Sequence, residues 1–524
     1  MRKDELKASA RQVVNDPTLS YHLRRHHLAS LAESALDYPK ISSECREALE
    51  KRVICDLFEG PAPYRPRYVL PDYARALSQG SEFLELEPPT DLDDALNFLL
   101  ILYTQVPSIT GYPVYLGDLD ALLLPFTTHI SDEHLYRSLR RFWIALDRIL
   151  PDAFVHTNIG PEDNRVARTI LRLERELLQV VPNLTLKVAA DITPDDLIED
   201  AVQTVFENGK PHFVNHELMV RDLGDRYGVV SCYNSLKVGG GAHTLVRLNL
   251  KEVALQHTGN LSRFFGDMLP YYAELAAELA EARICYLVEE ARFFEHDFLA
   301  KEGLVELDRF SAMYGIYGLA ECVNLLMAYG QDENASEVDE ATYGHDEAAN
   351  ELSYRIIREL ASYVGARSMP YCEGNDGRCF LHSQSGIDTD IDVSAGTRIP
   401  IGDEPELWDH IRAVSPHHDL FPAGVSDIFH VDETARRNPL AVVDIIRGAF
   451  QDGMRDFTFN LETNGFIRIT GYLVRKSDLV SFEQCGARHG SSAFGAGSVK
   501  NSHVDRRNTK RVGIRERSGT RPDQ

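Results

Sequence analysis

The chain has 524 residues, about three times the length of a typical domain, so several domains or one large helix-wrapped enzyme core is expected. Hydrophobic residues make up 44% and charged residues 26%, which excludes a disordered, collagen-like or coiled-coil protein. Its 55 basic and 80 acidic residues give a net charge of −25, which disfavours nucleic acids and anionic membranes as partners. The composition predicts a soluble enzyme.

Compartment signals also favour the cytoplasm. The first residues, MRKDELKASARQ, contain no apolar stretch, so no secretory signal is expected. The most apolar run, residues 95–103, is about half the ~20 residues that a membrane helix needs. Eight cysteines without a C-x-x-C pair are too dilute for a disulfide scaffold. We therefore expect a cytoplasmic, reducing location and no membrane partner.

Residues 1–80 are predicted to form a helical N-terminal region. Apolar residues follow helical spacing in residues 11–14, 21–36 and 44–58. Prolines at 61, 63 and 66 interrupt this spacing and mark a soft boundary. This region is expected to pack outside the enzyme core.

The main region, residues 81–475, combines helices with short β-rich runs. Helices are predicted over residues 163–181, 269–294 and 347–364, the last with Gly365 as its C-cap. The runs YGVVSCYNSL and HTLVRLNL flank the glycines at 239–241, which indicate either a tight turn or, less favoured, a phosphate cradle.

Two further β-rich runs, DFTFNL and GFIRITGYLV, lie near the end of this region. The Asn464-Gly465 pair between them predicts a hairpin, because both residues tolerate positive φ. The remaining segment, residues 476–524, ends in a basic tail with eight Lys or Arg and three Asp or Glu from residue 500 onward.

Candidate metal ligands are weak. The histidines at 417, 418 and 430 have no H-E-x-x-H pattern or nearby cysteine, so surface or hydrogen-bonded histidines are favoured. Cys372 and Cys379 form a single pair that is too widely spaced for a ribbon-type zinc site. We expect no bound metal.

The run Arg468-Ile469-Thr470-Gly471-Tyr472 carries the strongest signal. By propensity alone, a glycine within a β-run indicates a bulge or a close backbone approach. The run also resembles the R-V-x-G-Y signature of glycyl radical enzymes and lies near the C-terminus, as in that family. The resemblance implies a stored radical on Gly471, where a planar α-carbon shares the unpaired electron with the flanking amides and no side chain interferes.

A second resemblance concerns the cysteine that exchanges the radical with the substrate. The order of Cys232, the glycines, HTLVRLNL and a long helix is similar to the active-cysteine region of anaerobic ribonucleotide reductases. Cys232 is therefore the preferred thiyl residue, with Cys322 as its rival. Cys322 leaves a shorter chain to the glycine, and either cysteine could simply be a buried small hydrophobe.

Several features depart from known members. The chain lacks the Cys-Cys pair of pyruvate formate-lyase, the G-C-x-E of the dehydratases and the four-cysteine zinc site of the anaerobic reductases. Glu321, in GIYGLAE, is a candidate proton acceptor, although pairing with Arg247 is the simpler interpretation. Arg468 is expected to order the radical loop. Over most of residues 80–510 the chain most resembles the YjjI-type glycyl radical proteins.

This resemblance implies a ten-stranded α/β barrel made of two antiparallel five-stranded parallel halves wrapped by helices. It implies anaerobic radical chemistry on a small organic substrate by a lyase, dehydratase or reductase route, with no bound cofactor. A radical S-adenosylmethionine activating enzyme with an iron–sulfur cluster would generate the radical, and the basic tail would either dock it or be solvated. The family also suggests a homodimer. The alternative is a catalytically silent barrel that acts as a scaffold.

Overall fold

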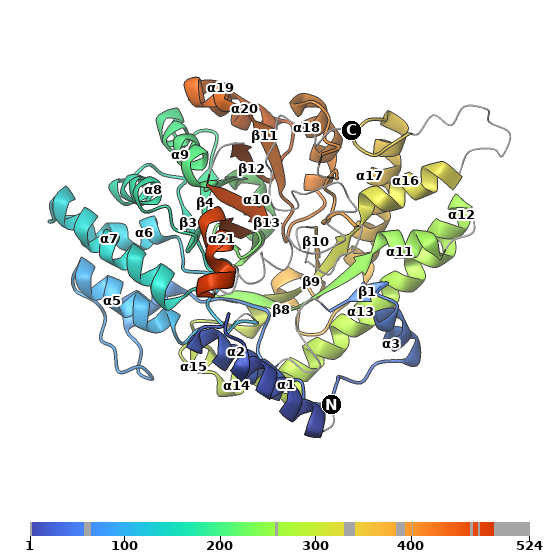
Figure 1. The fold of residues 1–524 in the computed structure, drawn as a ribbon, viewed down its shortest axis with the longest axis horizontal. Helices are drawn as coiled ribbons and strands as arrows, with labels where there is room; N and C mark the ends of the chain where they lie inside the picture. The colour runs from blue at the N-terminus through green and yellow to red at the C-terminus, as the bar shows by residue number, and fades with distance from the viewer. Residues whose placement is uncertain are drawn as a thin grey trace.

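The computed structural model describes residues 3–56, 64–109, 111–256, 260–329, 341–383, 393–400, 402–461, 465–469 and 472–486. Helices surround two central sheets (Figure 1). The strands are β1 Ile54–Cys55, β2 Tyr68–Leu70, β3 His156–Ile159, β4 Asn183–Val188, β5 His212–Asn215, β6 Tyr227–Val230, β7 Asn234–Lys237, β8 Gly240–Asn249, β9 Phe310–Tyr317, β10 Phe380–His382, β11 Asp427–Val431, β12 Asp456–Leu461, β13 Phe466–Ile469 and β14 Tyr472–Arg475.

The α-helices cover the outside of the sheets. They are α1 Lys3–Asn15, α2 Tyr21–Glu33, α3 Ser43–Glu50, α4 Tyr73–Gln79, α5 Leu92–Tyr103, α6 Leu119–Leu123, α7 Asp132–Ile149, α8 Arg165–Leu177, α9 Asp195–Asn208, α10 His216–Leu223, α11 Leu250–Leu255, α12 Leu261–Arg263, α13 Leu269–Cys285, α14 Phe293–His296, α15 Phe298–Lys301, α16 Leu319–Tyr329, α17 Glu347–Ala366, α18 Leu407–His418, α19 Glu433–Arg437, α20 Pro439–Gln451 and α21 Lys476–Cys485. The predicted helices over residues 163–181, 269–294 and 347–364 are confirmed by α8, α13 and α17.

Each of the two large sheets has five strands. One has the order β1-β8-β9-β10, with β2 also paired to β8, and the other has the order β11-β12-β5-β4-β3. Strands β8, β9 and β10 are mutually parallel, as are β3, β4 and β5, whereas β12 meets β5 antiparallel. Every residue of β4, β8, β9 and β12 is buried, as expected for strands covered on both faces. Within the described ranges, strand pairing does not close the two sheets into one ring.

The N-terminal region contributes strands as well as helices. The predicted helix over residues 44–58 is wrong over residues 51–56, because α3 ends at Glu50, and residues 57–58 lie outside the described residues. Arg52 adopts φ 58°, and Ile54 and Cys55 then pair with Leu248 and Arg247 of β8. The β-branched pair Val53-Ile54 favours an extended chain, and pairing with a buried strand overrides the helical spacing.

The predicted hairpin between DFTFNL and GFIRITGYLV is also wrong. Strand β12 pairs with β11 and β5, and β13 pairs with β14 instead. A strand buried on both faces needs a partner on each side, and neighbouring sheet strands supply both. The hairpin therefore lies within GFIRITGYLV, where Ile469 and Tyr472 are paired. Residues 462–464 lie outside the described residues.

Two glycine predictions need correction. Only Gly239 has positive φ, 77°, as a tight turn requires. Gly240 and Gly241 already belong to β8, and a methyl group on Gly241 would lie 2.1 Å from the Tyr68 carbonyl oxygen, so close strand packing explains that glycine. Gly365 is not a C-cap, because α17 continues to Ala366 and leaves in an extended conformation at Arg367.

The last described helix, α21, ends beside the connection between α1 and α2. Figure 1 shows α21 (red) close to α2 (blue) on one side of the sheets. A methyl group on Gly486 would lie 2.5 Å from the carbonyl oxygen of Thr18, which connects α1 and α2. In the described part of the chain, no helix has the length and hydropathy required to cross a membrane.

Candidate active site

Cys232 lies at the tip of a hairpin between the sheets. We call residues 227–237 the finger hairpin: β6 and β7 pair from Tyr227–Lys237 to Val230–Asn234, and three residues connect them. Ser231 and Tyr233 both adopt positive φ, 52° and 65°, which L-residues rarely do without tertiary support. The Cys232 side chain is 7% exposed. The fold therefore holds one thiol in a strained, enclosed turn.

Strand β3 clamps the finger hairpin through side chains. The Asn158 amide donates to the Val229 carbonyl and accepts from the Val229 amide, both at 2.8 Å. His156 Nδ1 lies 3.1 Å from the Ser231 carbonyl oxygen, and because a carbonyl only accepts, Nδ1 carries the proton. Because the Asn158 side chain pairs with both the N–H and the C=O of Val229, it takes the place that a neighbouring strand would occupy at this edge of the finger hairpin.

Strand β5 holds the other side of the tip. The Tyr233 ring stacks on the His212 ring with 3.2 Å between centroids, and its hydroxyl shares hydrogen bonds with the Asn183 amide. His212 Nδ1 is in turn 2.8 Å from Asp456 Oδ1. The residues flanking Cys232 are thus fixed by both β3 and β5.

The electrostatics of the site keep the thiol protonated. Burial raises the pKa of Cys232 to about 11, although the Ser231 hydroxyl and the charges of Arg67 and Arg398 act in the opposite direction. At neutral pH the residue is therefore a thiol with an intact S–H bond. This favours hydrogen-atom donation over thiolate nucleophilic chemistry.

Cys322 occupies a different environment. It lies in α16, is 0% exposed and belongs to the hydrophobic core. Burial raises its thiol pKa well above the ordinary value. No strained turn presents this cysteine, so its surroundings match those of a small core hydrophobe.

Glu321 lies in the first turn of the same helix. Its Oε1 accepts a 2.7 Å hydrogen bond from the Ser394 hydroxyl, while Oε2 is buried and has no hydrogen-bond partner within the described part of the chain. The interpretation as a partner of Arg247 is not supported, because the Arg247 guanidinium lies over the Tyr317 ring and donates to the Cys55 sulfur.

Gly471 lies outside the described residues, as does Thr470. The flanking residues are described: Ile469 and Tyr472 are Cα partners at the end of the β13–β14 ladder. The backbone of Arg468 belongs to β13, where it pairs with Leu473.

The candidate metal ligands have other partners. His417 Nε2 lies 3.0 Å from the Ser353 hydroxyl, and His418 Nε2 lies 2.9 Å from Asp427 Oδ2. The thiols of Cys372 and Cys379 contact each other, and this hydrogen bond raises the pKa of Cys372. Over the described ranges, no group of three or more His, Cys, Asp or Glu is arranged to hold a metal ion.

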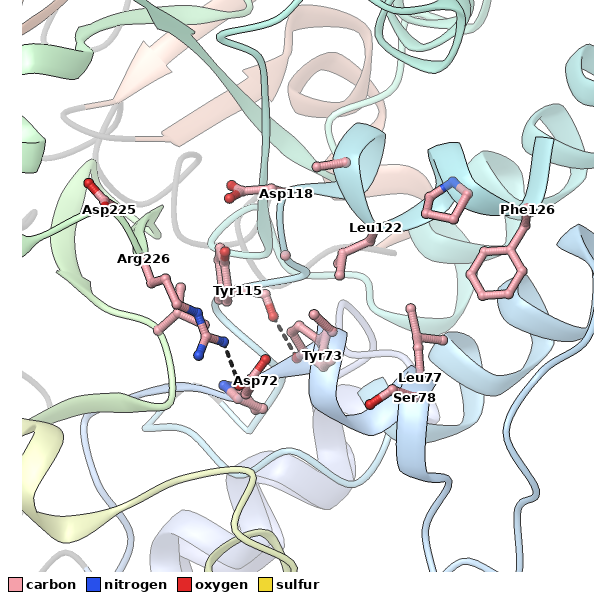
Figure 2. A pocket seen from close by; sticks show the side chains of 16 residues that line it. Asp72, Tyr73, Leu77, Ser78, Tyr115, Asp118, Leu122, Phe126, Asp225 and Arg226 are labelled. Carbon is pink, nitrogen blue, oxygen red and sulfur yellow. Dashed lines mark hydrogen bonds and ion pairs between the residues drawn. The ribbon is translucent and has the colours of Figure 1, made fainter. Parts of the chain in front are cut away.

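A separate cavity of about 370 Å³ lies at the base of the finger hairpin, the end opposite Cys232. Figure 2 shows its lining, where Arg226 pairs with Asp72 and the Tyr73 hydroxyl donates to the Tyr115 carbonyl. Arg226 directly precedes β6, so this cavity borders the support of the hairpin rather than its tip.

The supporting residues His156, Asn158 and His212 were not predicted from the sequence. Their signal is weak: polar residues within short strand-like runs, HTNI and HFVN, that are otherwise buried. Buried polar side chains in strands need partners. The sequence alone does not show that these partners lie on the finger hairpin.

The comparisons with known proteins identify the family. The chain matches the family described as "Glycyl radical enzyme YjjI-like" over residues 19–510. It is 47% identical over 505 residues to "Uncharacterized protein YjjI" of Escherichia coli (strain K12), covering 96% of each chain.

Solved structures show the same fold. An anaerobic ribonucleotide reductase matches with TM-score 0.67 and 11% identity, over 92% of this chain and 85% of that chain. The B12-independent glycerol dehydratase from Clostridium butyricum matches with TM-score 0.66 and 12% identity, over 95% and 88%. The two five-stranded sheets are therefore those of a glycyl radical enzyme barrel, and the chain belongs to the YjjI-like family of glycyl radical enzymes.

Proposed function

We propose that this enzyme stores a radical on Gly471 and uses Cys232 to pass it to a small organic substrate. A radical S-adenosylmethionine activating enzyme removes one hydrogen atom from the Gly471 α-carbon. No cofactor resides in the protein, because the iron–sulfur cluster belongs to the activating enzyme. The chemistry runs anaerobically in the cytoplasm, since oxygen would trap the radical.

The transfer steps balance as hydrogen-atom exchanges. The Cys232 S–H bond breaks, its hydrogen atom restores the second C–H bond of Gly471, and the unpaired electron moves to sulfur. The thiyl radical then takes a hydrogen atom from a substrate carbon and re-forms S–H. The substrate radical rearranges or eliminates in a lyase, dehydratase or reductase reaction, where the buried Oε2 of Glu321 is a candidate proton acceptor.

The observation that carries this proposal is the position of Cys232. It occupies the tip of the finger hairpin between two positive-φ residues, and side chains of β3 and β5 hold that tip. A structural cysteine needs no such strained turn. Burial also excludes water and preserves the protonated thiol that hydrogen-atom transfer needs.

Electron paramagnetic resonance tests the proposal. The protein is incubated without oxygen with a candidate activating enzyme, S-adenosylmethionine and a reductant. We expect a glycyl doublet that disappears in Gly471→Ala, and chain cleavage at residue 471 when oxygen is admitted. A doublet that persists in Gly471→Ala would refute the assignment, and absence of signal with several activases would favour the silent scaffold.

Solvent deuterium identifies the cysteine. In D₂O the thiol of Cys232 exchanges its proton for a deuteron. If Cys232 exchanges hydrogen atoms with Gly471, this deuterium replaces the hydrogen on the glycyl α-carbon, and the doublet becomes a singlet. Cys232→Ala should keep the doublet in D₂O, and Cys322→Ala should behave as the wild type. The reverse pattern would assign the thiyl to Cys322.

A further inference from the structure

Basic side chains gather around the carboxyl ends of three parallel strands. Gly315 of β9 is the Cα partner of Arg247 on β8 and of His382 on β10. Residues in register on adjacent strands share a face, so the two side chains flank Gly315 across about 10 Å. A methyl group on Gly315 would lie 2.7 Å from Arg247 Cγ, so glycine leaves the room that this arginine occupies. Carboxyl ends of parallel strands are common ligand sites.

The buried ring of His382 makes no hydrogen bond that would account for a histidine at this position among the described residues. The residue is 0% exposed, and neither ring nitrogen has a hydrogen-bond partner among the residues that the structure describes. Burial, together with the charges of Arg67 and Arg247, lowers its pKa well below the ordinary value, so the ring is neutral and keeps one N–H donor. A buried donor and acceptor left unpaired cost stability unless a ligand or water uses them.

Gly424 lies between the same ring and the finger hairpin. A methyl group on Gly424 would lie 3.4 Å from His382 Cδ2 and 2.7 Å from the Tyr233 carbonyl oxygen. The amide of Ser383 donates to the Gly424 carbonyl, and the amide of Ser235 donates to the Ala423 carbonyl. The end of β10 and the tip that carries Cys232 therefore adjoin one backbone segment.

Two more arginines reach this region. The Arg398 Nε donates to the carbonyl of Ser426, whose hydroxyl lies 3.1 Å from His212 Nδ1 beneath Tyr233. Arg67 lies with its guanidinium carbon 5.1 Å from the ring centroid of Tyr68 and is 4% exposed.

The charges of these arginines affect the pKa values of Cys232 and His382. Arg67 and Arg398 both stabilise the anionic form of Cys232, while the carboxylate of Asp152 opposes them more weakly. Arg67 also acts on His382, together with Arg247. We call these residues the cationic cluster: Arg67, Arg247, His382 and Arg398.

We propose that the substrate of Cys232 is an organic anion whose carboxylate or phosphate group binds at the cationic cluster. Guanidinium groups bind such oxyanions with charge-assisted hydrogen bonds, and the neutral imidazole of His382 supplies a further donor. This inference rests on the proposed function, because Cys232 must be the residue that meets the substrate. It adds the substrate class, which the family membership leaves open.

Binding of small anions to the full-length protein, without activation, tests the proposal. The probes are acetate, followed by saturation-transfer NMR, and inorganic phosphate, followed by ³¹P line broadening, with glycerol as the neutral control. Ionic strength is held constant with sodium chloride. We expect saturable binding of acetate or phosphate and no binding of glycerol. The anion that binds with the higher affinity identifies the anionic group of the substrate.

Variants locate the binding. Arg398→Gln should weaken it about tenfold, the typical effect of losing a charged hydrogen bond, and His382→Gln should weaken it in the same direction. Arg398→Lys should retain most of it. Arg140→Gln on the exposed face of α7 is the matched control and should bind as the wild type.

Binding that is unchanged in both Arg398→Gln and His382→Gln would overturn the proposal, as would equal binding of glycerol or no anion binding at all. If Arg398→Gln does not fold, His382→Gln decides alone. The two failures are distinguishable. A glycyl doublet without anion binding removes only the substrate class. Anion binding without a doublet removes the radical assignment and, with it, the role of the anion as the substrate of Cys232.

Discussion

The Asn158 clamp makes the most direct structural prediction. Asn158→Ala removes the hydrogen bonds that its side chain makes to the Val229 amide and carbonyl, both at 2.8 Å. Each bond contributes about 0.5–1.5 kcal/mol net, so opening of the finger hairpin should become easier by about 1–3 kcal/mol. Because about 1.4 kcal/mol corresponds to a tenfold change, amide exchange of residues 224–238 should accelerate about 5- to 150-fold.

Hydrogen–deuterium exchange with mass spectrometry measures this opening locally and needs no assumption about global unfolding. Asn97→Ala, at an exposed position of α5, is the control and should leave the exchange of residues 224–238 unchanged. In the activated enzyme, Asn158→Ala should still form the Gly471 doublet but slow its conversion to a singlet in D₂O. An acceleration below about twofold at residues 224–238 would refute the idea that β3 holds the hairpin.

The other predictions concern protonation, packing and a buried ion pair. The pKa of Cys232 in the folded protein is about 11, so the stability that its protonated thiol contributes is present below the ordinary thiol pKa and is lost as pH rises toward 11. The rate at which the doublet converts to a singlet in D₂O should therefore be constant from pH 7 to about 9.5. A twofold fall in this rate by pH 9 would contradict the prediction. Gly315→Ala should cost about 1–3 kcal/mol by displacing Arg247, which calorimetry would detect as a lower Tm. Glu174→Gln should cost about 3–5 kcal/mol, because it removes the carboxylate charge that lies 2.8 Å from the buried Lys210 ammonium. Urea denaturation would show this loss, and adding Lys210→Met should recover much of it.

Local patterns were sufficient for the family and for many elements. The RITGY run and the segment around Cys232 pointed to a glycyl radical enzyme, and the family match confirms that identification. Helical spacing located α8, α13 and α17, because a helix satisfies its own backbone and shows its period over a dozen residues. The fold class followed from the resemblance rather than from the pattern of elements.

The pairing of strands required the tertiary structure. The sequence suggested that DFTFNL would pair with the run that follows it, yet β12 pairs with β5, more than 200 residues earlier. Such contacts depend on which buried strands can satisfy each other's backbone groups in a sheet, and short local runs do not encode that choice.

The surroundings of Cys232 were decided in the same way. The sequence singled out the thiol, whereas the structure supplied the Asn158 clamp from β3, the His212 stack from β5 and the unpaired His382 at the end of β10. Each is a single polar residue in an otherwise strand-like run, and its role depends on a partner far away in the chain. The amino-acid sequence by itself thus determined the family, glycyl radical enzymes of the YjjI-like type. Only the folded arrangement of strands decided which groups meet the thiol, because hydrogen bonds and charges act over a few ångströms in space and not along the chain.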